Sequence, residues 1–402
     1  MIEPFRSATY IIQKLEEKGF EAYFVGGSVR DFLLKRPIHD VDIATSATPE
    51  EMKKLFSNTV DIGIAHGTIL ILHRGNGYEV TTFRAESEYI DFRRPEKVKF
   101  IRSLFEDLQR RDFTMNAIAM DKNGQMIDPF NGQQCIQEKM IQAVGNPDER
   151  FQEDALRMIR AMRFVSQLDF SLQPQTKNAI EKNADLLKHI AIERLFAEFT
   201  KLLNGANKKH AIELLFETGL YKFIPGFSES KEMFLDCKNL DINQLSENQM
   251  WLLFIYFSKT ESAEKLLRAW KMPSKKIKYL TKALPILHTR LKNEWTTYSL
   301  YQATKAISID VEVVNKTIKK ETVANVEKDM NEIFSKMVIQ QRDQMDVTGE
   351  DLMKWFNRTG GPWIKLLLND IEKAIVMNKI PNEKAGIKGW IQTCNHQQGN
   401  DY

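Results

Sequence analysis

Apolar and polar positions divide the 402-residue chain into two regions of different periodicity. Before about residue 138, short runs of strand character stand between helical segments. Thr68–His73 and residues 78–83, for example, flank a turn-forming segment at 74–77, which is typical of a hairpin. Beyond residue 138 the strand signals nearly vanish, so we expect an α+β region followed by an all-α remainder. Helices are predicted in that remainder at 151–167, 174–189, 192–203, 210–218, 252–257, 263–270, 275–291 and 323–337.

Two acidic residues in the first region carry candidate chemistry. Residues 40–44 alternate polar and apolar side chains, which predicts a half-buried strand with Asp40 and Asp42 on one face. Neighbouring carboxylates repel each other unless a cation lies between them, and Mg²⁺ binds such hard oxygen ligands together with substrate phosphates. If the hairpin lies beside this strand, Glu79 adds a third acidic group at the metals. The alternative for Glu79 is an exposed strand glutamate.

The residues just before this strand are suited to phosphate. An apolar strand at 23–25 ends at Gly26 and Gly27, and Ser28 is placed to cap a helix that begins at Val29. Without Cβ atoms the backbone can approach a ligand closely, and the N–H groups at a helix start attract phosphate. The order of strand, glycine pair, helix and acidic strand indicates nucleotidyl transfer.

Four stretches of the chain together resemble the class II tRNA nucleotidyltransferases, the CCA-adding enzymes and their poly(A) polymerase relatives. They are GGSVRDFLLKRPIHDVDIAT at 26–45, RRDFTMNAIAM at 110–120, IDPFNG at 127–132 and EDALRMIRAMRFV at 153–165. The resemblance implies template-independent addition of C, C and A to the 3′ end of tRNA from CTP and ATP, with release of pyrophosphate. It also implies two Mg²⁺ ions held by Asp40 and Asp42.

The same resemblance suggests a division of the chain into four parts. It implies a polymerase beta-like nucleotidyltransferase head at 1–138 and a helical neck that recognises the base at 139–205. A helical body at 206–300 and a tRNA-binding tail at 301–402 would complete an elongated protein. A flexible loop is expected at 84–96, where Asp91, Arg93 and Arg94 fit the family pattern.

Several residues of the head are expected to contact the nucleotide. Arg30 and Arg111 are placed to meet a triphosphate. The alternative for Arg30 is an ion pair with Asp31 or Asp42. Asp112 is expected to hold the ribose or to orient Arg111. The alternative for the charged residues 110–112 is a salt-bridged surface. The resemblance supports nucleotide contacts at Gly27, Arg30, Arg111, Asp112 and Asn116.

A helix at 151–167 would place Asp154, Arg157, Arg160 and Arg163 on one slowly turning stripe. Cytosine and adenine present an amino donor beside a ring-nitrogen acceptor, while uracil and guanine present the reverse arrangement. A carboxylate and a guanidinium would therefore accept C and A and refuse U and G. The resemblance assigns this role to Asp154 and Arg157, while Arg160 and Arg163 could hold base or phosphate. An amphipathic helix with an Asp–Arg pair is the alternative.

Residues 265–292 contain no Asp or Glu and form the clearest basic segment, with Trp270 and Tyr279 interleaved among its lysines. Phosphate contact is the natural use of such a segment, and a solvated helical face is the alternative. The residues expected to bind tRNA are Lys271, Lys275, Lys276, Lys278 and Lys282.

Composition adds few further constraints. A net charge of +3 is too small to indicate a nucleic-acid partner by itself. No apolar run is long enough to span a bilayer, and the N-terminal segment lacks the layout of a signal peptide, so no membrane partner is expected. The three cysteines lie far apart, which suits a reducing cytoplasm.

Some alternatives stay open at this level. Poly(A) synthesis, or the addition of A alone or CC alone, would use the same chemistry. An RNA-binding module on a decayed transferase fold would keep the fold without catalysis. A homodimer is also left open.

Overall fold

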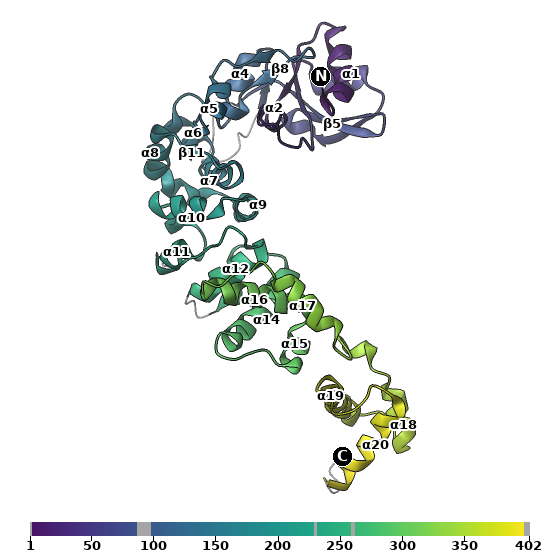
Figure 1. Ribbon diagram of the computed structural model, residues 1–402. Coiled ribbons are helices and arrows are strands. Elements are labelled where there is room, and N and C mark those ends of the chain that lie inside the picture. The colour runs from purple at the N-terminus through teal and green to yellow at the C-terminus, as the bar shows by residue number, and fades with distance from the viewer. Residues whose placement is uncertain (1, 87–97, 229–230, 259–261, 398–402) are drawn as a thin grey trace. The chain divides into compact units, whose positions relative to one another are not determined.

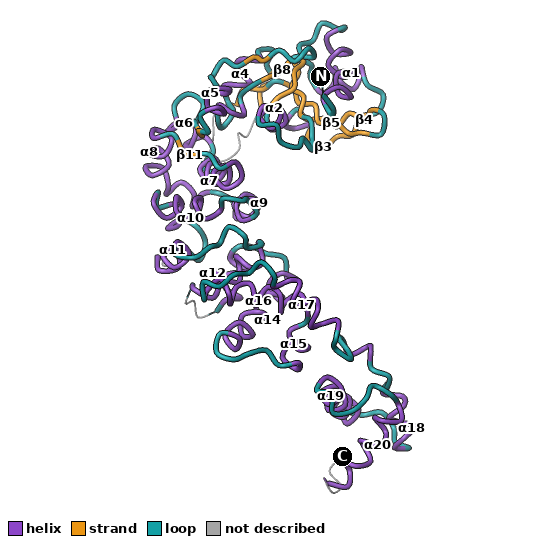
Figure 2. Tube along the Cα trace, viewed as in Figure 1, coloured by secondary structure: helices purple, strands orange, loops and turns teal. Residues whose placement is uncertain are grey.

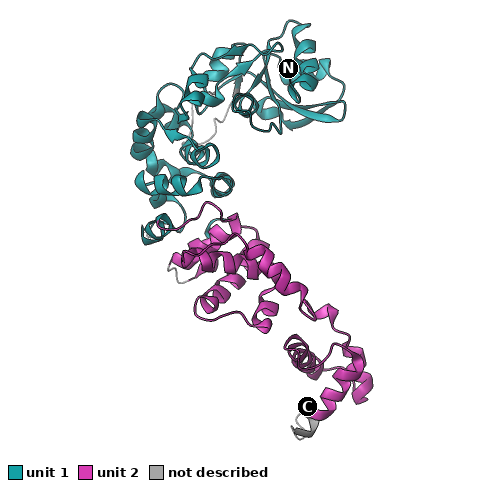
Figure 3. Cartoon of the chain, viewed as in Figure 1, with its two compact units in different colours: residues 1–238, 269–271 teal, residues 239–268, 272–402 magenta. Residues whose placement is uncertain are grey.

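The computed structural model describes residues 2–86, 98–228, 231–258 and 262–397 (Figure 1). These residues form two compact units, shown in teal and magenta in Figure 3. Unit 1 comprises residues 1–238 and 269–271, and unit 2 comprises residues 239–268 and 272–402. The division into four parts stays a prediction, and the loop residues Asp91, Arg93 and Arg94 lie outside the described residues.

A seven-stranded mixed sheet forms the centre of the N-terminal part of unit 1, with strand order β3-β4-β5-β2-β1-β8-β9. Figure 2 shows almost all the strands gathered in this part of the chain. The predicted hairpin is confirmed as β4 and β5, and β5 pairs in parallel with β2. The seven strands are β1 (Ala22–Val25), β2 (Asp42–Thr45), β3 (Thr59–Gly63), β4 (Thr68–His73), β5 (Asn76–Thr82), β8 (Ala119–Met120) and β9 (Met126–Ile127). The short pairs are β6 (Arg84–Glu86) with β7 (Val98–Phe100), and β10 (Met140–Ile141) with β11 (Ser171–Leu172).

Short helices flank the sheet, and their starts follow local capping chemistry. Thr48 and Glu51 form a reciprocal capping box at the start of α3, and the Ser103 side chain accepts from the Glu106 N–H at α4. The predicted cap at Ser28 is wrong, because its hydroxyl donates to the Val25 carbonyl while Gly26 occupies the cap position of α2. The helices are α1 (Phe5–Glu16), α2 (Gly27–Leu33), α3 (Pro49–Leu55), α4 (Leu104–Gln109) and α5 (Gly132–Gln137), with 3₁₀ turns η1 (Ile64–His66) and η2 (Thr114–Asn116).

Helices complete unit 1, but the helix predicted at 151–167 is divided in two. Asp154 leaves the helical conformation (φ −144°, ψ 100°), and its carboxylate accepts from the Leu156 N–H at the start of the next helix. Aspartate favours such a cap position because its side chain competes for main-chain N–H groups. The helices are α6 (Pro147–Glu153), α7 (Leu156–Leu168), α8 (Pro174–Asn183), η3 (Ala184–His189), α9 (Ile192–Leu203), α10 (Lys208–Glu217), η4 (Leu220–Phe223) and α11 (Lys231–Lys238).

The all-α prediction for the remainder is confirmed in unit 2, whose described residues form helices and turns. These helices are α12 (Glu247–Phe257), α13 (Ala263–Ala269), α14 (Ser274–Arg290), α15 (Thr297–Ala303), α16 (Lys305–Ile318), α17 (Val326–Ser335), η5 (Arg342–Gln344), α18 (Gly349–Phe356), α19 (Pro362–Val376) and α20 (Lys384–Gln397). Among the residues described, no helix combines the length and apolar character that crossing a membrane requires.

Candidate active site

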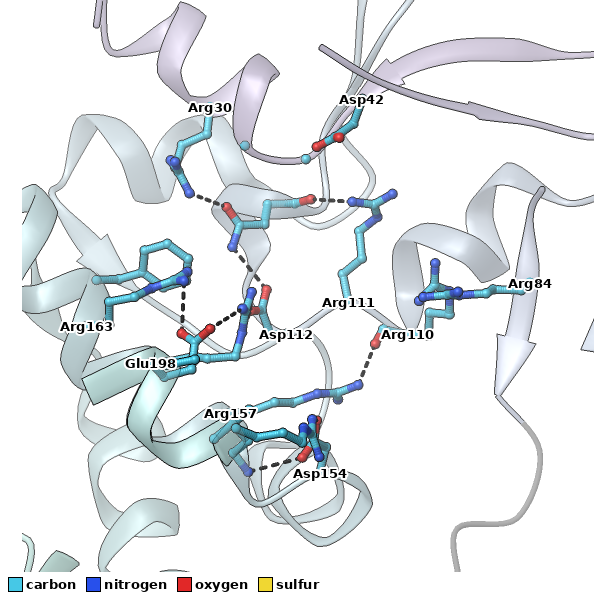
Figure 4. Close-up of a pocket in the computed structure, with 18 residues that line it drawn as sticks. Arg30, Asp42, Arg84, Arg110, Arg111, Asp112, Asp154, Arg157, Arg163 and Glu198 are labelled. Atoms are coloured by element: carbon cyan, nitrogen blue, oxygen red, sulfur yellow. Dashed lines mark hydrogen bonds and ion pairs between the residues drawn. The ribbon is translucent and has the colours of Figure 1, made fainter. Parts of the chain in front are cut away.

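A cavity of about 620 Å³ in unit 1 brings the head and the helices after it to one site (Figure 4). The start of α2 and the first residue of β2 form one side. The segment after α4 forms a second side, and α7 and α9 form the third. Guanidinium groups dominate its lining, which suits a highly charged anion. The predicted nucleotide residues that line it are Gly27, Arg30, Arg111, Asp112, Asn116, Asp154, Arg157, Arg160 and Arg163.

The acidic side of the cavity is built by paired strands. Asp42 is the first residue of β2 and lies directly opposite Glu79 of β5, so the predicted neighbourhood of these two carboxylates is confirmed. Burial, together with the negative charges of Glu79 and Asp40, raises the pKa of Asp42 to about 6, although Arg111 opposes the shift. A carboxylate held beside other negative charge is suited to a divalent cation.

The placement of Asp40 differs from the prediction. Asp40 precedes β2 and is exposed, so the alternating strand begins later than expected. Within the described ranges, no group of three or more His, Cys, Asp or Glu side chains is arranged to hold a metal ion. Mg²⁺ commonly takes one or two carboxylates and completes its coordination with substrate phosphates.

Gly26 brings the backbone close to the side chains of Arg111 and Asp42. Its φ is +72°, and a Cβ at this position would lie 3.2 Å from Arg111 Nη1 and 3.5 Å from Asp42 Oδ2. Gly27 was predicted as the phosphate contact, but a side chain at Gly26 would come between the acidic and basic sides of the cavity. The positive φ favours glycine at this position, and a side chain there would require Arg111 to shift slightly.

Arg30 has two partners at the cavity wall. Its guanidinium forms an ion pair with Asp31 at 2.9 Å, as the alternative prediction anticipated, and Nη1 donates to Asn116 Oδ1 at 2.9 Å. Asn116 in turn donates from Nδ2 to Asp112 Oδ1 at 3.0 Å. Arg30 is thereby fixed at the cavity wall, and its contact with a nucleotide stays a prediction.

Arg111 and Asp112 have different partners from those expected. Arg111 pairs with Asp107 at 3.1 Å, whereas Asp112 pairs with Arg160 at 2.6 Å. The prediction that Asp112 orients Arg111 is therefore wrong. Burial alone would raise the pKa of Asp112, but the Arg160 guanidinium and the Asn116 amide hold that pKa well below its usual range. Sequence reasoning missed Asp107, although its spacing of three and four residues from two arginines, which follow the end of α4, was a usable signal.

Asp154 and Arg157 lie at the start of α7 rather than along one helical stripe. Asp154 forms an ion pair with Arg194 of α9 at 2.7 Å. Arg157 pairs with Glu153 at 2.8 Å, and its Nη2 donates to the main-chain oxygen of Arg110 at 2.9 Å (Figure 4). Both side chains are held by these neighbours, and both line the cavity.

A buried acid supports the other two arginines of α7. Arg163 pairs with Glu198 of α9 at 2.9 Å, and Arg160 lies 3.6 Å from the same carboxylate. Burial and the positive charge of Arg160 lower the pKa of Arg163 to about 10. Glu198 was not predicted, because it belongs to a helix 35 residues further along the chain than Arg163 and no local motif links the two.

The basic segment at 265–292 is less uniform than its sequence suggested. Trp270 is fully buried, with its ring 4.8 Å from that of Phe199, and therefore belongs to the core of unit 1. Tyr279 donates to Asp310 at 2.6 Å in unit 2. These two aromatic residues are used for packing and internal hydrogen bonding, which is their usual role when buried.

The five lysines expected to bind tRNA fall into two groups. Lys271 pairs with Glu193 in unit 1, and Lys276 pairs with Glu247 in unit 2. The exposed lysines of α14 recur at intervals of three and four residues, so they share one face of the helix. These are Lys275, Lys278 and Lys282.

Comparison with known proteins agrees with this architecture. The head-domain model of poly(A) polymerases matches residues 22–142, the RNA and SrmB-binding site model of polymerase A matches 169–230, and the second-domain model of tRNA nucleotidyltransferases matches 243–391. A CCA-adding enzyme of Geobacillus sp. (strain WCH70) is 48% identical over 393 residues, which are 97% of each chain. One from Bacillus cytotoxicus is 47% identical and covers 97% of this chain and 99% of its own. The crystal structure of the Bacillus stearothermophilus CCA-adding enzyme with CTP is similar at a TM-score of 0.91, with 40% identity and 99% of both chains covered.

The mixed sheet places neighbouring carboxylates beside a glycine turn and opposite arginine-bearing helices. This arrangement defines a nucleotidyltransferase. Proteins of this class generally use divalent metal ions. Within the class, the chain belongs to the family of CCA-adding enzymes.

Proposed function

We propose that this protein adds C, C and A in turn to the 3′ end of tRNA, from CTP and ATP and without a nucleic-acid template. The observation that carries this proposal is the single cavity in which Asp42, the Gly26–Gly27 turn and the arginines of α7 meet. One bound nucleoside triphosphate can there present its phosphates to the head and its base to the helices. The CTP complex of the similar Bacillus stearothermophilus enzyme supports the same assignment.

In the reaction, the 3′-oxygen of tRNA forms a bond to the α-phosphorus, and the bond from that phosphorus to the bridging oxygen breaks to release pyrophosphate. Asp42 and Asp40 would hold Mg²⁺ together with the triphosphate, and Glu79 lies near enough to Asp42 to assist. When bound, Mg²⁺ lowers the pKa of the attacking hydroxyl and neutralises charge on the leaving group.

The triphosphate is proposed to lie between the start of α2 and Arg111. Main-chain N–H groups at Gly27 and the guanidinium of Arg111 supply hydrogen-bond donors, and Arg30 adds positive charge. Asp112 and Asn116 act by holding Arg160 and Arg30 in place. The base would then meet Asp154 and Arg157, with Arg160 and Arg163 behind them.

The direct test uses two tRNAs, one that lacks CCA and one that ends in CC, each incubated with CTP alone, ATP alone, and both nucleotides. The expected product carries CC with CTP alone and CCA with both nucleotides. A product ending in CC even with both nucleotides would indicate CC addition alone. A single A added only to a tRNA already ending in CC would indicate A addition alone, and a run of A would indicate poly(A) synthesis. If the wild-type protein incorporates nothing while it binds tRNA, an RNA-binding module on this fold is the better description.

The exposed lysines of α14 are proposed to contact tRNA phosphates. Replacing Lys275, Lys278 and Lys282 together with glutamine is expected to weaken tRNA binding and reduce its dependence on salt. For every lysine that neutralises a phosphate in the wild type, the slope of log affinity against log salt should fall by about 0.7–0.9 in the variant. Binding measured across a salt series by fluorescence anisotropy checks this expectation.

The matched control for that experiment is Lys276→Gln on the same helix. Lys276 is half-buried and paired with Glu247, so its loss should leave the salt slope nearly unchanged. An unchanged slope in the triple variant would instead show that these lysines form a solvated helical face.

The cytoplasmic location and the homodimer stay predictions.

A further inference from the structure

Asp107 is a buried acid that has no role in the predicted site or in the proposed mechanism. Its side chain is 1% exposed and lies on α4, next to the cavity. Oδ1 accepts from Arg110 Nη2 at 2.7 Å, and Oδ2 accepts from Arg111 Nη2 at 3.1 Å. The carboxylate also accepts from the main-chain N–H of Arg84 at 3.3 Å.

The charge of this group is retained in spite of its burial. Burial by itself would raise the pKa of Asp107, but the guanidiniums of Arg110 and Arg111 lower that pKa overall. Residues three and four positions apart meet on one side of a helical turn, so both arginines reach one carboxylate. Arg84, Arg110 and Arg111 all line the cavity, and Asp107 therefore holds three parts of its wall.

The end of α4 also reaches the base side of the site. The last carbonyls of a helix have no partner within the helix and need donors from elsewhere. Here Arg150 donates to the Gln109 carbonyl at 3.1 Å, and Arg157 donates to the Arg110 carbonyl at 2.9 Å. The turn that Asp107 stabilises thus carries both the Arg111 side chain and the Arg110 carbonyl that accepts from Arg157.

We infer that Asp107 is a positioning residue, which aims Arg111 at the triphosphate and keeps the Arg110 carbonyl in place for Arg157. This inference rests on the proposed function. It differs from a purely structural role because it concerns how the nucleotide is held rather than whether the head folds.

The test is Asp107→Asn, an exchange that preserves shape and an acceptor oxygen but removes the charge. The KM for CTP and for ATP should each rise about tenfold, with kcat changed by less than about threefold, because charge-assisted bonds to the arginines are lost. Affinity for cytidine, which lacks phosphates, should change less than affinity for CTP. Steady-state incorporation into tRNA and competition by CTP or cytidine supply the two readouts.

Three further arms make the outcome decisive. Asp61→Asn removes an exposed acid paired with Lys53 in the same head and should leave both constants unchanged. In a double variant with Arg111→Gln, Asp107→Asn should add less to the KM than it does alone, because both changes act through Arg111. If Asp107→Asn does not fold, Asp107→Glu keeps the charge but moves its oxygens, and the KM should rise in the same direction.

An unchanged KM in the folded Asp107 variant, or full additivity with Arg111→Gln, would overturn the inference. Failure of the wild-type protein to incorporate any nucleotide would instead overturn the proposed function. The two failures are therefore distinguished in one experiment.

Discussion

Replacing Asp42 with asparagine is expected to reduce nucleotide incorporation into tRNA by about a thousandfold. The reason is that metal-assisted stabilisation of a phosphoryl transition state is worth several kcal/mol, and each 1.36 kcal/mol is tenfold in rate. We expect this large effect because Asp42 begins β2 at the cavity and lies opposite Glu79. Single-turnover incorporation of CMP from CTP, with Mg²⁺ varied, measures the effect.

The same experiment ranks the three acids of the site. Asp40→Asn should have a large effect, since Asp40 is proposed to hold Mg²⁺ directly, and Glu79→Gln a smaller one, since Glu79 is proposed only to assist beside Asp42. Binding of tRNA should survive in each variant, which separates lost chemistry from lost folding. Activity of Asp42→Asn within tenfold of the wild type would contradict the proposed role of Asp42.

The parts of the fold that the sequence predicted well depend on local rules. The β4–β5 hairpin followed from two apolar runs around a glycine-containing turn. The start of α3 obeys the same kind of local rule, because acidic residues follow Pro49 in the first turn and Thr48 forms a capping box with Glu51. The position of Asp42 beside Glu79 followed once the hairpin was placed next to the acidic strand. The first two features are decided by residues close together in the chain, whereas the third depended on the hypothesis that the hairpin lies beside β2.

The features that were missed depend on contacts between distant segments. Glu198 reaches Arg163 from another helix, and no spacing rule connects them. Trp270 lies among lysines in the sequence, yet its ring packs on Phe199 because burial of a large aromatic surface outweighs the charge of its neighbours. The break at Asp154 was hidden by helical spacing on both sides of it.

The break at Asp154 determines how its carboxylate can meet a base. Because the Asp154 carboxylate accepts from the Leu156 N–H and pairs with Arg194, it is held at the cavity wall instead of turning with a helix. A fixed acceptor next to a fixed donor, Arg157, suits the edges of cytosine and adenine. Uracil and guanine would leave a carbonyl facing the carboxylate, and an unsatisfied buried polar group costs about 1–3 kcal/mol.

Asp154→Ala should therefore raise incorporation of UMP relative to CMP by roughly tenfold, while the KM for CTP changes much less. Asp154→Asn is the sharper variant, because its amide can donate to the uracil carbonyl and should favour UTP further. Asp185→Ala, at an exposed acid paired with Lys188, is the matched control and should leave the choice of nucleotide unchanged. Competition between UTP and CTP on a tRNA lacking CCA measures the ratio. If both Asp154 variants keep the wild-type preference, the carboxylate does not read the base, and Asp154 serves only to bind the Leu156 N–H and Arg194.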